Sequence, residues 1–293
     1  MGRAPAPGGG APRTSPGGRG RPLRQVTSSR NPALSLVRQL QSKRTRRERR
    51  LLVAEGEDVV IAALERGARP VAVLVDADRV GAGDPLLAAL PADLDERYAV
   101  PGTLLARVST LAVPPRVIAV LPQPGPNHFR TVAFPPSLAL FLAGVGDPGN
   151  VGTLVRTAAA LGCDWVALGP GSADLANPRA VRAAMGATFT IPVLEGVRAA
   201  DLATRGGFRV AAAQARGGVP PWEADLTGPL VLALGAERAG LGEAGEELAG
   251  GLEVVAVTIP QEDGAESLNV AAAGAAILAE ARRQRASGAG GVT

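Results

Sequence analysis

One junction of strand, loop and helix organises the rest of the chain, and it reads Thr258-Ile-Pro-Gln-Glu-Asp-Gly-Ala-Glu-Ser-Leu-Asn-Val270. The apolar run over 254–259 indicates a strand that stops at Pro260, because proline cannot continue a central strand. A polar loop follows, and the alanine-rich pattern over 267–284 is typical of a helix. Ser267 is a good N-cap residue, so we expect polar side chains and free backbone N–H groups to gather where the loop meets the helix.

The same alternation of strand and helix extends back from this stretch to residue 137. We expect strands at 138–145, 165–168, 190–194, 208–213, 230–234 and 254–259, and helices at 151–161, 179–184, 197–204 and 267–284. This order predicts an α/β fold with a mostly parallel sheet and helices on both faces. Such sheets bind ligands at the carboxyl ends of their strands, where polar, glycine-containing junctions lie at 144–150, 235–240 and 260–269.

The first half of the chain predicts a second, smaller α/β unit. Strands are expected at 51–54, 71–75 and 117–121, and helices at 57–66, 85–90 and 101–108. We therefore divide the chain into a disordered basic arm (1–30), a small amino-terminal α/β domain (31–122), a proline-rich linker (123–136), the larger domain (137–286) and a flexible tail (287–293).

Composition narrows the class of protein. The only cysteine, Cys163, excludes a disulfide within the chain, and with His128 it is too few for a cysteine–histidine zinc site, so we expect no metal. No apolar run approaches the roughly 20 residues of a membrane span, and the amino terminus lacks the apolar core of a secretory signal. We expect a cytoplasmic protein without a membrane partner.

The charge is distributed unevenly. The chain has 31 lysines and arginines against 27 acidic residues, yet 13 of the basic residues and only Glu48 fall within residues 1–50. A basic arm on an acidic body favours a polyanionic partner, usually nucleic acid, although a solvated tail explains the arm nearly as well. The cluster over 43–50 contains Arg44, Arg46 and Arg47 and is either a solvated helix face or a phosphate-binding patch.

The three junctions supply the candidate site residues. Residues 144–149 match the G-x-G-x-x-G pattern of dinucleotide sites, but Asp147 and Pro148 disfavour a bound pyrophosphate. Asn150 follows as an expected N-cap, and Arg156 lies in an otherwise apolar helix, which favours a functional role over a surface one. Glu237 occupies the second junction, either in the site or against a helix dipole. Two further arginines, Arg179 and Arg182, one turn apart, either bind a phosphate or only solvate their helix.

Three motifs carry a resemblance to a known family. They read Asp-Pro-Gly-Asn-Val-Gly-Thr-Leu-Val-Arg at 147–156, Leu-Gly-Ala-Glu-Arg-Ala-Gly-Leu at 234–241, and Ile-Pro followed by Glu-Ser-Leu-Asn-Val within 259–270. They resemble the signatures of SpoU/TrmH enzymes of the SPOUT superfamily, which are S-adenosylmethionine-dependent RNA ribose 2′-O-methyltransferases. The resemblance covers 137–284 closely and extends more weakly over 50–122. Arg238 departs from the family pattern, since glycine is common at its position.

The resemblance implies a carboxyl-terminal trefoil knot, a homodimer formed through that domain, and an amino-terminal domain that binds RNA. By matching position it assigns catalysis to Asn150, Arg156, Glu237, Ser267 and Asn269, and S-adenosylmethionine binding to Leu234, Gly235, Ile259 and Leu268. The RNA-binding candidates are Arg44, Arg46, Arg47, Arg179 and Arg182.

The substrate and the mechanism follow as hypotheses. A separate substrate domain and a basic arm favour ribosomal RNA over transfer RNA, and a non-catalytic RNA-binding or ribosome-assembly protein is the rival from another class. Arginine stays protonated, so we expect Arg156 to stabilise a developing alkoxide rather than to accept a proton. Asn150 and a phosphate would hold it.

Overall fold

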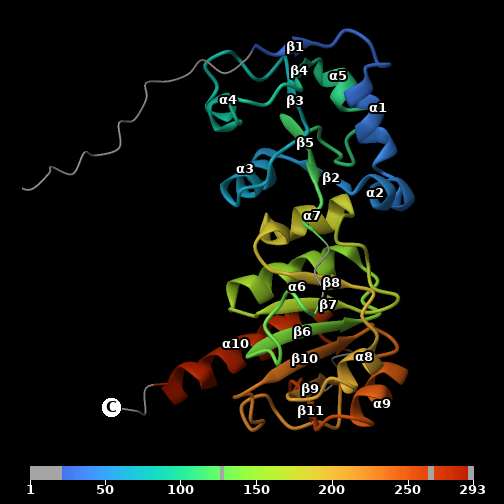
Figure 1. Ribbon diagram of the computed structural model, residues 1–293, viewed down its shortest axis with the longest axis vertical. Coiled ribbons are helices and arrows are strands. Elements are labelled where there is room, and N and C mark those ends of the chain that lie inside the picture. Colours follow the sequence, from blue (N-terminus) through green and yellow to red (C-terminus); the bar gives the residue numbers. More distant parts are fainter. Residues whose placement is uncertain (1–21, 126–128, 263–266, 290–293) are drawn as a thin grey trace, which may run out of the picture.

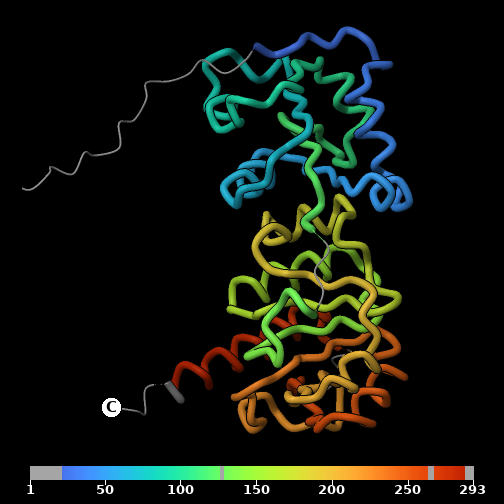
Figure 2. Tube along the Cα trace, in the orientation of Figure 1, coloured from blue at the N-terminus to red at the C-terminus, as the bar shows by residue number. Residues whose placement is uncertain are grey.

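Two α/β domains stack along the long axis of the molecule (Figure 1). This computed structural model describes residues 22–125, 129–262 and 267–289. The tube in Figure 2 shows that the amino-terminal half of the chain fills one domain before the chain enters the other. Most of the predicted basic arm, His128 and the end of the predicted tail lie outside the described residues.

The amino-terminal domain contains a five-stranded mixed sheet in the order β1-β4-β3-β5-β2. Strands β1, β4 and β3 are parallel, whereas β5 is antiparallel to both β3 and β2. The strands are β1 (Arg24–Gln25), β2 (Leu51–Glu55), β3 (Ala72–Asp76), β4 (Arg97–Val100) and β5 (Val117–Pro122). The helices are α1 (Pro32–Gln39), α2 (Lys43–Arg49), α3 (Glu57–Glu65), α4 (Pro85–Ala89) and α5 (Gly102–Leu105).

Two strands of this sheet differ from the sequence-based prediction. Strand β1 lies inside the arm expected to be disordered, because Val26 is buried and the β1 backbone pairs with Tyr98 and Ala99 of β4. The prediction of a disordered arm over 1–30 is therefore wrong from Arg24 onward. Strand β4 was not predicted, since it is short and begins with Arg97, a charged residue whose guanidinium is buried and donates to two backbone carbonyls.

The second domain contains a six-stranded sheet in the order β11-β9-β10-β6-β7-β8, with every pair parallel. Its strands are β6 (Leu138–Ala143), β7 (Trp165–Leu168), β8 (Val193–Glu195), β9 (Arg209–Ala213), β10 (Leu230–Gly235) and β11 (Val254–Val257). Its helices are α6 (Pro148–Ala160), α7 (Pro178–Ala184), α8 (Ala199–Ala203), α9 (Glu243–Ala249) and α10 (Val270–Ala289), and a 3₁₀ turn, η1, spans Ala187–Phe189.

Helices cover both faces of this sheet, as the sequence predicted. The apolar side chains of α6 and α10 pack on one face, and those of α8 and α9 pack on the other. The parallel register confirms the α/β class, and it places the carboxyl ends of β6, β7, β8 and β10 at one edge. The trefoil knot stays a prediction from the family resemblance.

Two helices begin at residues other than those predicted. Helix α6 is capped by Asp147, whose Oδ1 accepts from the Asn150 N–H at 3.0 Å, so Asn150 lies inside the helix rather than at its cap. Helix α10 is capped by Asn269, whose Oδ1 accepts from the N–H groups of Ala271 and Ala272 at 2.9 and 3.2 Å. Ser267 therefore lies two residues before the cap, and its side chain is exposed.

The two domains share a packed boundary. Val181 of α7 and Ala176 join the apolar cluster around β2 and α3 of the amino-terminal domain. Arg46 of α2 donates through Nη2 and Nε to Asp174 Oδ2 at 2.8 and 3.1 Å, and its side chain is buried. The prediction that Arg46 contacts RNA is therefore wrong, because its guanidinium is buried and hydrogen-bonded within the protein.

Candidate active site

A cavity of about 670 Å³ opens at the carboxyl ends of β9, β10 and β11. All four predicted cofactor residues line it: Leu234, Gly235, Ile259 and Leu268. Leu268 is 43% exposed although it is apolar, and such a side chain is a natural wall for a bound ligand. Its position fits the predicted role of a cofactor wall.

The loop after β10 closes tightly on itself at this cavity. Ala236 and Gly240 exchange two backbone hydrogen bonds of 2.9 and 2.8 Å, so the chain turns back within a few residues. A Cβ atom at Gly235 would lie 2.0 Å from the Gly240 carbonyl carbon, which only glycine avoids. The tight turn fixes Glu237 at the cavity rim, even though Arg238 departs from the family pattern.

Hydrogen bonds join the three junctions that the sequence singled out. Asn150 Nδ2 donates to Glu237 Oε1 at 2.7 Å, and Asn269 Nδ2 donates to Asn150 Oδ1 at 3.0 Å. Asn150 lies 87 residues from Glu237 and 119 from Asn269, so only the fold brings these side chains together. The Asp147 cap holds the Asn150 backbone in turn. We call Asn150, Glu237 and Asn269 the amide–carboxylate cluster.

The remaining catalytic candidates lie outside this cluster. The Arg156 side chain is exposed on α6 and makes no hydrogen bond or ion pair with another described residue. The expected contact with Asn150 is absent from the described residues, because six positions along a helix place the two side chains on different faces. Ser267 lines the cavity without a hydrogen bond from any residue described by the structure.

Apart from Arg46, the predicted RNA-binding arginines fall into three groups. Arg44 and Arg47 are exposed on α2, with Arg44 in a surface pair with Glu48. Arg179 is 58% exposed and its Nη2 donates to Asp147 Oδ2 at 3.1 Å, beside the active-site helix. Arg182 is half-buried, and its Nη1 has no hydrogen-bond partner among the described residues.

Sequence reasoning missed two contributors to the site. Asp147 was read as an obstacle to a pyrophosphate, whereas it caps α6 and pairs with Arg179. Helix α9 was not predicted, although Gly245 and Glu246 line the cavity. The acidic residues of its first turn were a usable signal, because glutamates favour a helix amino terminus.

The cavity fits a nucleoside cofactor. Leu234, Ile259 and Leu268 supply apolar walls, and Glu237 and Gln261 supply polar groups at the same cavity. Pockets for such ligands are mostly apolar with a few placed polar groups. An apolar cavity beside a hydrogen-bonded polar cluster, at the carboxyl edge of a parallel sheet, defines the binding edge of an α/β enzyme.

Comparison with known proteins identifies the family. The sequence profile of the SpoU rRNA Methylase family matches residues 137–279. A 23S rRNA (guanosine(2553)-2′-O)-methyltransferase of Bacillus subtilis is 30% identical over 264 residues, which cover 87% of this chain and 98% of that protein. The chain belongs to the SpoU rRNA methylase family, whose members are S-adenosylmethionine-dependent RNA 2′-O-methyltransferases of the SPOUT superfamily.

Solved structures agree over nearly the whole chain. An S-adenosylmethionine-bound rRNA methyltransferase from Sinorhizobium meliloti has a TM-score of 0.76 at 30% identity and covers 91% of this chain and 99% of that one. A SpoU methyltransferase from Streptomyces viridochromogenes, also with S-adenosylmethionine, has a TM-score of 0.75 at 26% identity, with 88% and 99% covered. Both protein domains are thus shared with these enzymes, and the cofactor is S-adenosylmethionine.

Proposed function

We propose that this enzyme methylates a ribose 2′-hydroxyl of ribosomal RNA in the cytoplasm, with the amide–carboxylate cluster and Arg156 as its catalytic groups. The observation that carries the proposal is the pair of hydrogen bonds from Asn150 to Glu237 and from Asn269 to Asn150, at the rim of the cofactor cavity. Three relatives are named as methyltransferases of 23S rRNA, which supports ribosomal RNA over transfer RNA.

The reaction requires a better nucleophile than a free ribose hydroxyl. When bound, S-adenosylmethionine supplies an electrophilic methyl group and takes the carbon–sulfur electron pair as it leaves. The Arg156 side chain is exposed on α6, the helix that also carries Asn150, and it has no partner among the described residues, so its guanidinium is available to the substrate. Placed against the 2′-oxygen or its flanking phosphate, it stabilises the charge that develops there. The hydroxyl proton then leaves to solvent.

The cluster positions the groups around the reacting atoms. Glu237 accepts from Asn150 and so fixes which end of the Asn150 amide is a donor. Asn269 uses its oxygen to cap α10 and its nitrogen to bind Asn150, which ties the cofactor loop to α6. Ser267 lines the cavity, and its hydroxyl, which bonds to no residue that the structure describes, is offered to the cofactor or the nucleotide.

We propose further that two copies of the chain pair through the second domain. Trp222 is 59% exposed and follows Pro221, whose carbonyl accepts from Gln284 of α10. Val219 is 40% exposed and lies beside β11. Exposed aromatic side chains of this size favour burial against a partner. Light scattering that finds a monomer at micromolar concentration would contradict the dimer.

No helix in the described part of the chain is long and apolar enough to cross a membrane.

The function is tested by transfer of a tritiated methyl group to unmethylated ribosomal and transfer RNA, followed by mapping of the modified nucleotide. We expect label on a single ribose of ribosomal RNA. Label confined to transfer RNA would overturn the choice of substrate. Cofactor binding without any transfer, measured by titration calorimetry, would instead favour the non-catalytic assembly protein.

Replacing Arg156 tests its role directly. Arg156→Ala should lower the methyl-transfer rate by roughly 10² to 10³, the usual effect of losing one donor to a developing oxyanion. The affinity for S-adenosylmethionine should stay nearly unchanged. Arg282→Ala, which removes another exposed helix arginine, is the matched control. Retained turnover in the Arg156 variant would rule out this assignment.

A further inference from the structure

A second cavity, of about 260 Å³, lies between the two domains. Its apolar walls come from both domains, because Leu52 belongs to β2 whereas Ala176 and Val193 belong to the catalytic domain. Its polar lining consists of four side chains: Arg50, Gln123, Thr188 and Glu195. A cavity with apolar walls and a few polar groups is suited to a small, amphipathic ligand.

Two polar groups in this cavity lack partners among the described residues. Thr188 is only 3% exposed, and its Oγ1 makes no hydrogen bond there. Gln123 uses its Nε2 to donate to the Arg46 and Leu51 carbonyls, both at 3.0 Å, and its Oε1 accepts from no described residue. Leaving a buried polar group unsatisfied is unfavourable, so the Thr188 hydroxyl indicates a polar ligand. The half-buried Gln123 offers that ligand an acceptor oxygen at the same cavity.

Two charged side chains complete the cavity. Arg50 ends α2 in the left-handed region (φ 53°), and its Nη2 donates to the Pro124 carbonyl at 2.9 Å. Glu195 ends β8, and desolvation together with the Asp174 carboxylate raises its pKa, while Arg47 and Arg50 oppose the rise. A carboxylate and an amide oxygen are acceptors, and a guanidinium offers a flat cationic face.

We propose that this interdomain cavity binds an unpaired nucleobase of the RNA substrate, one that carries an exocyclic amino group. Gln123 Oε1 and the Glu195 carboxylate accept from the amino group, Thr188 meets the ring edge, and Arg50 stacks on the ring. Proteins that read RNA sequence use splayed-out bases in this way, stacked on apolar or arginine surfaces and bonded along their edges. The inference deepens the proposed function and rests on it.

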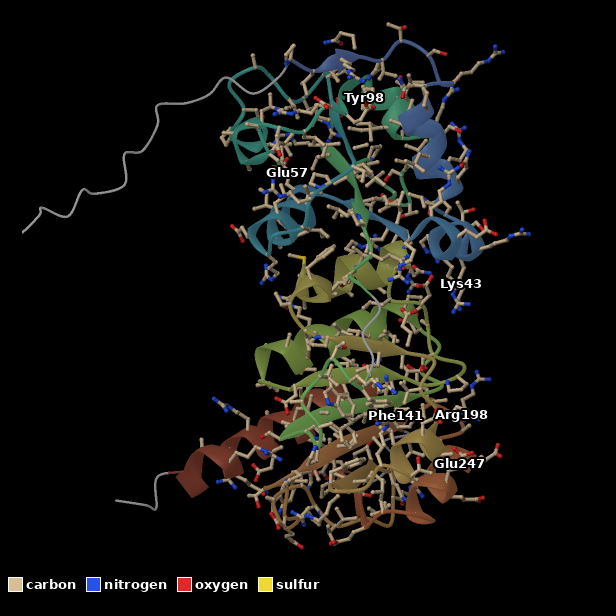
Figure 3. The ribbon with its side chains drawn as sticks, viewed as in Figure 1. Lys43, Glu57, Tyr98, Phe141, Arg198 and Glu247 are labelled. Carbon is tan, nitrogen blue, oxygen red and sulfur yellow. The ribbon has the colours of Figure 1, made fainter. Side chains whose placement is uncertain are left out.

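The position of the cavity supports an RNA base over a free metabolite. Helix α2 beside it presents exposed Lys43, Arg47 and Arg49, and Figure 3 shows Lys43 near the boundary between the domains. These cations suit the flanking phosphates. Glu195 lies at the carboxyl end of β8, at the same edge of the parallel sheet as the active site. One RNA strand thus has a path from the cavity to the reacting ribose.

The test combines crosslinking with variants of the full-length protein. Wild-type protein is irradiated with unmethylated ribosomal RNA, and crosslinked peptides are identified by mass spectrometry. We expect a nucleotide on peptides that contain Gln123 or residues 193–195. Ala176→Leu fills the cavity and Thr188→Val removes its buried hydroxyl. Each should weaken RNA binding about tenfold, because a stacked base contributes on that scale, and should reduce the crosslink.

The control is Thr190→Val, the same exchange at an exposed residue that does not line the cavity, and it should bind RNA as the wild type does. S-adenosylmethionine affinity should stay unchanged in all variants, which also shows that they are folded. Absence of crosslinks from the cavity peptides, or wild-type RNA affinity in both cavity variants, would overturn the proposal. Crosslinks to these peptides without methyl transfer would refute the proposed function alone. Equal binding of free adenosine, cytidine and guanosine monophosphates in the cavity, without RNA, would instead indicate a metabolite site.

Discussion

At the scale of single residues, two variants of Glu237 can separate the effect of its charge from the effect of its hydrogen bond to Asn150. Glu237→Gln keeps an oxygen that can accept from Asn150 Nδ2, whereas Glu237→Ala removes it. If Glu237 acts by orienting Asn150, the glutamine variant should retain activity within about fivefold, and the alanine variant should lose roughly 10²-fold or more. Methyl-transfer rates at saturating RNA measure the difference.

The matched control for Glu237 is Glu243→Gln, an exposed glutamate at the start of α9 that does not line the cofactor cavity. It should leave the rate unchanged. Equal losses in the glutamine and alanine variants of Glu237 would show that its charge, rather than its hydrogen bond to Asn150, is what the reaction needs.

Cys163 offers a second residue-scale prediction, because it is the only thiol in the chain. Burial, with the nearby Asp164 carboxylate, raises its pKa from 9.0 to about 12. The folded protein should therefore react roughly 10³-fold more slowly with a thiol reagent at pH 8 than the unfolded chain does. A raised pKa also means that the thiol's contribution to stability is complete below pH 9 and is lost as the pH rises toward 12.

A fast reaction of the native thiol at pH 8, at the rate of the urea-unfolded chain, would contradict the burial of Cys163. Cys163→Ala supplies the unreactive blank. Unfolding of this variant should depend less on pH above pH 9 than unfolding of the wild type, since the variant lacks the titrating thiol.

At the scale of elements, Asn269 has two functions that a pair of substitutions can separate. Its oxygen caps α10, and its nitrogen binds Asn150. Asn269→Ala should lower the free energy of unfolding by about 1 kcal/mol, the usual value of a cap, and should also reduce activity. Asn269→Asp keeps the capping oxygen but loses the donor, so it should restore the melting temperature without restoring activity.

Ser267→Ala is the matched control, because sequence reasoning placed the cap of α10 at this residue. In the structure Asn269 caps this helix, and Ser267 makes no hydrogen bond with a described residue, so the melting temperature should not change. Loss of stability in the Ser267 variant, with none in Asn269→Ala, would show instead that Ser267 is the residue that caps α10. Thermal unfolding followed by circular dichroism decides between the two.

The helices and strands also show where sequence patterns are enough to predict the structure. Long apolar runs and amphipathic helices located nearly every strand and helix of the second domain, because burial on both sheet faces leaves a clear signal. Strand β4 and helix α9 escaped prediction. The first begins with a buried arginine, and the second has Leu248 as its only buried residue. The N-cap residues were predicted wrongly for a different reason. Several polar residues lie near each helix start, and only tertiary contacts determine which of them caps the helix.

At the scale of the whole molecule, the site was more predictable than the boundary between the domains. The three motifs identify Asn150, Glu237 and Asn269, yet nothing local reveals their mutual hydrogen bonds. Arg44 and Arg46 stand two residues apart in one basic cluster, and the sequence treats them alike. Arg46 is buried because it forms an ion pair across the domain boundary with Asp174, which lies 128 residues away in the sequence. Contacts of this range depend on the finished fold.

The buried pair of Arg46 and Asp174 should therefore hold the amino-terminal domain against the second domain. Arg46 also donates to the Leu40 and Gln41 carbonyls at 2.9 and 2.8 Å, so its removal leaves three acceptors unsatisfied. Breaking a buried pair from one side costs about 3–5 kcal/mol. Arg46→Ala should lower the free energy of unfolding by that amount. If the amino-terminal domain binds RNA as we propose, the KM for RNA should also rise, since the two domains lose their alignment.

Arg44→Ala provides the comparison on the same helix, because its pair with Glu48 is 86% and 57% exposed. Exposed pairs contribute about 0–1 kcal/mol, so this variant should unfold almost as the wild type does. Its KM for RNA should rise if Arg44 contacts phosphate. A double-mutant cycle between Arg46→Ala and Asp174→Ala then measures the coupling across the boundary. A coupling energy near zero would mean that the apolar contacts of α7 with β2, rather than this ion pair, fix the two domains relative to each other.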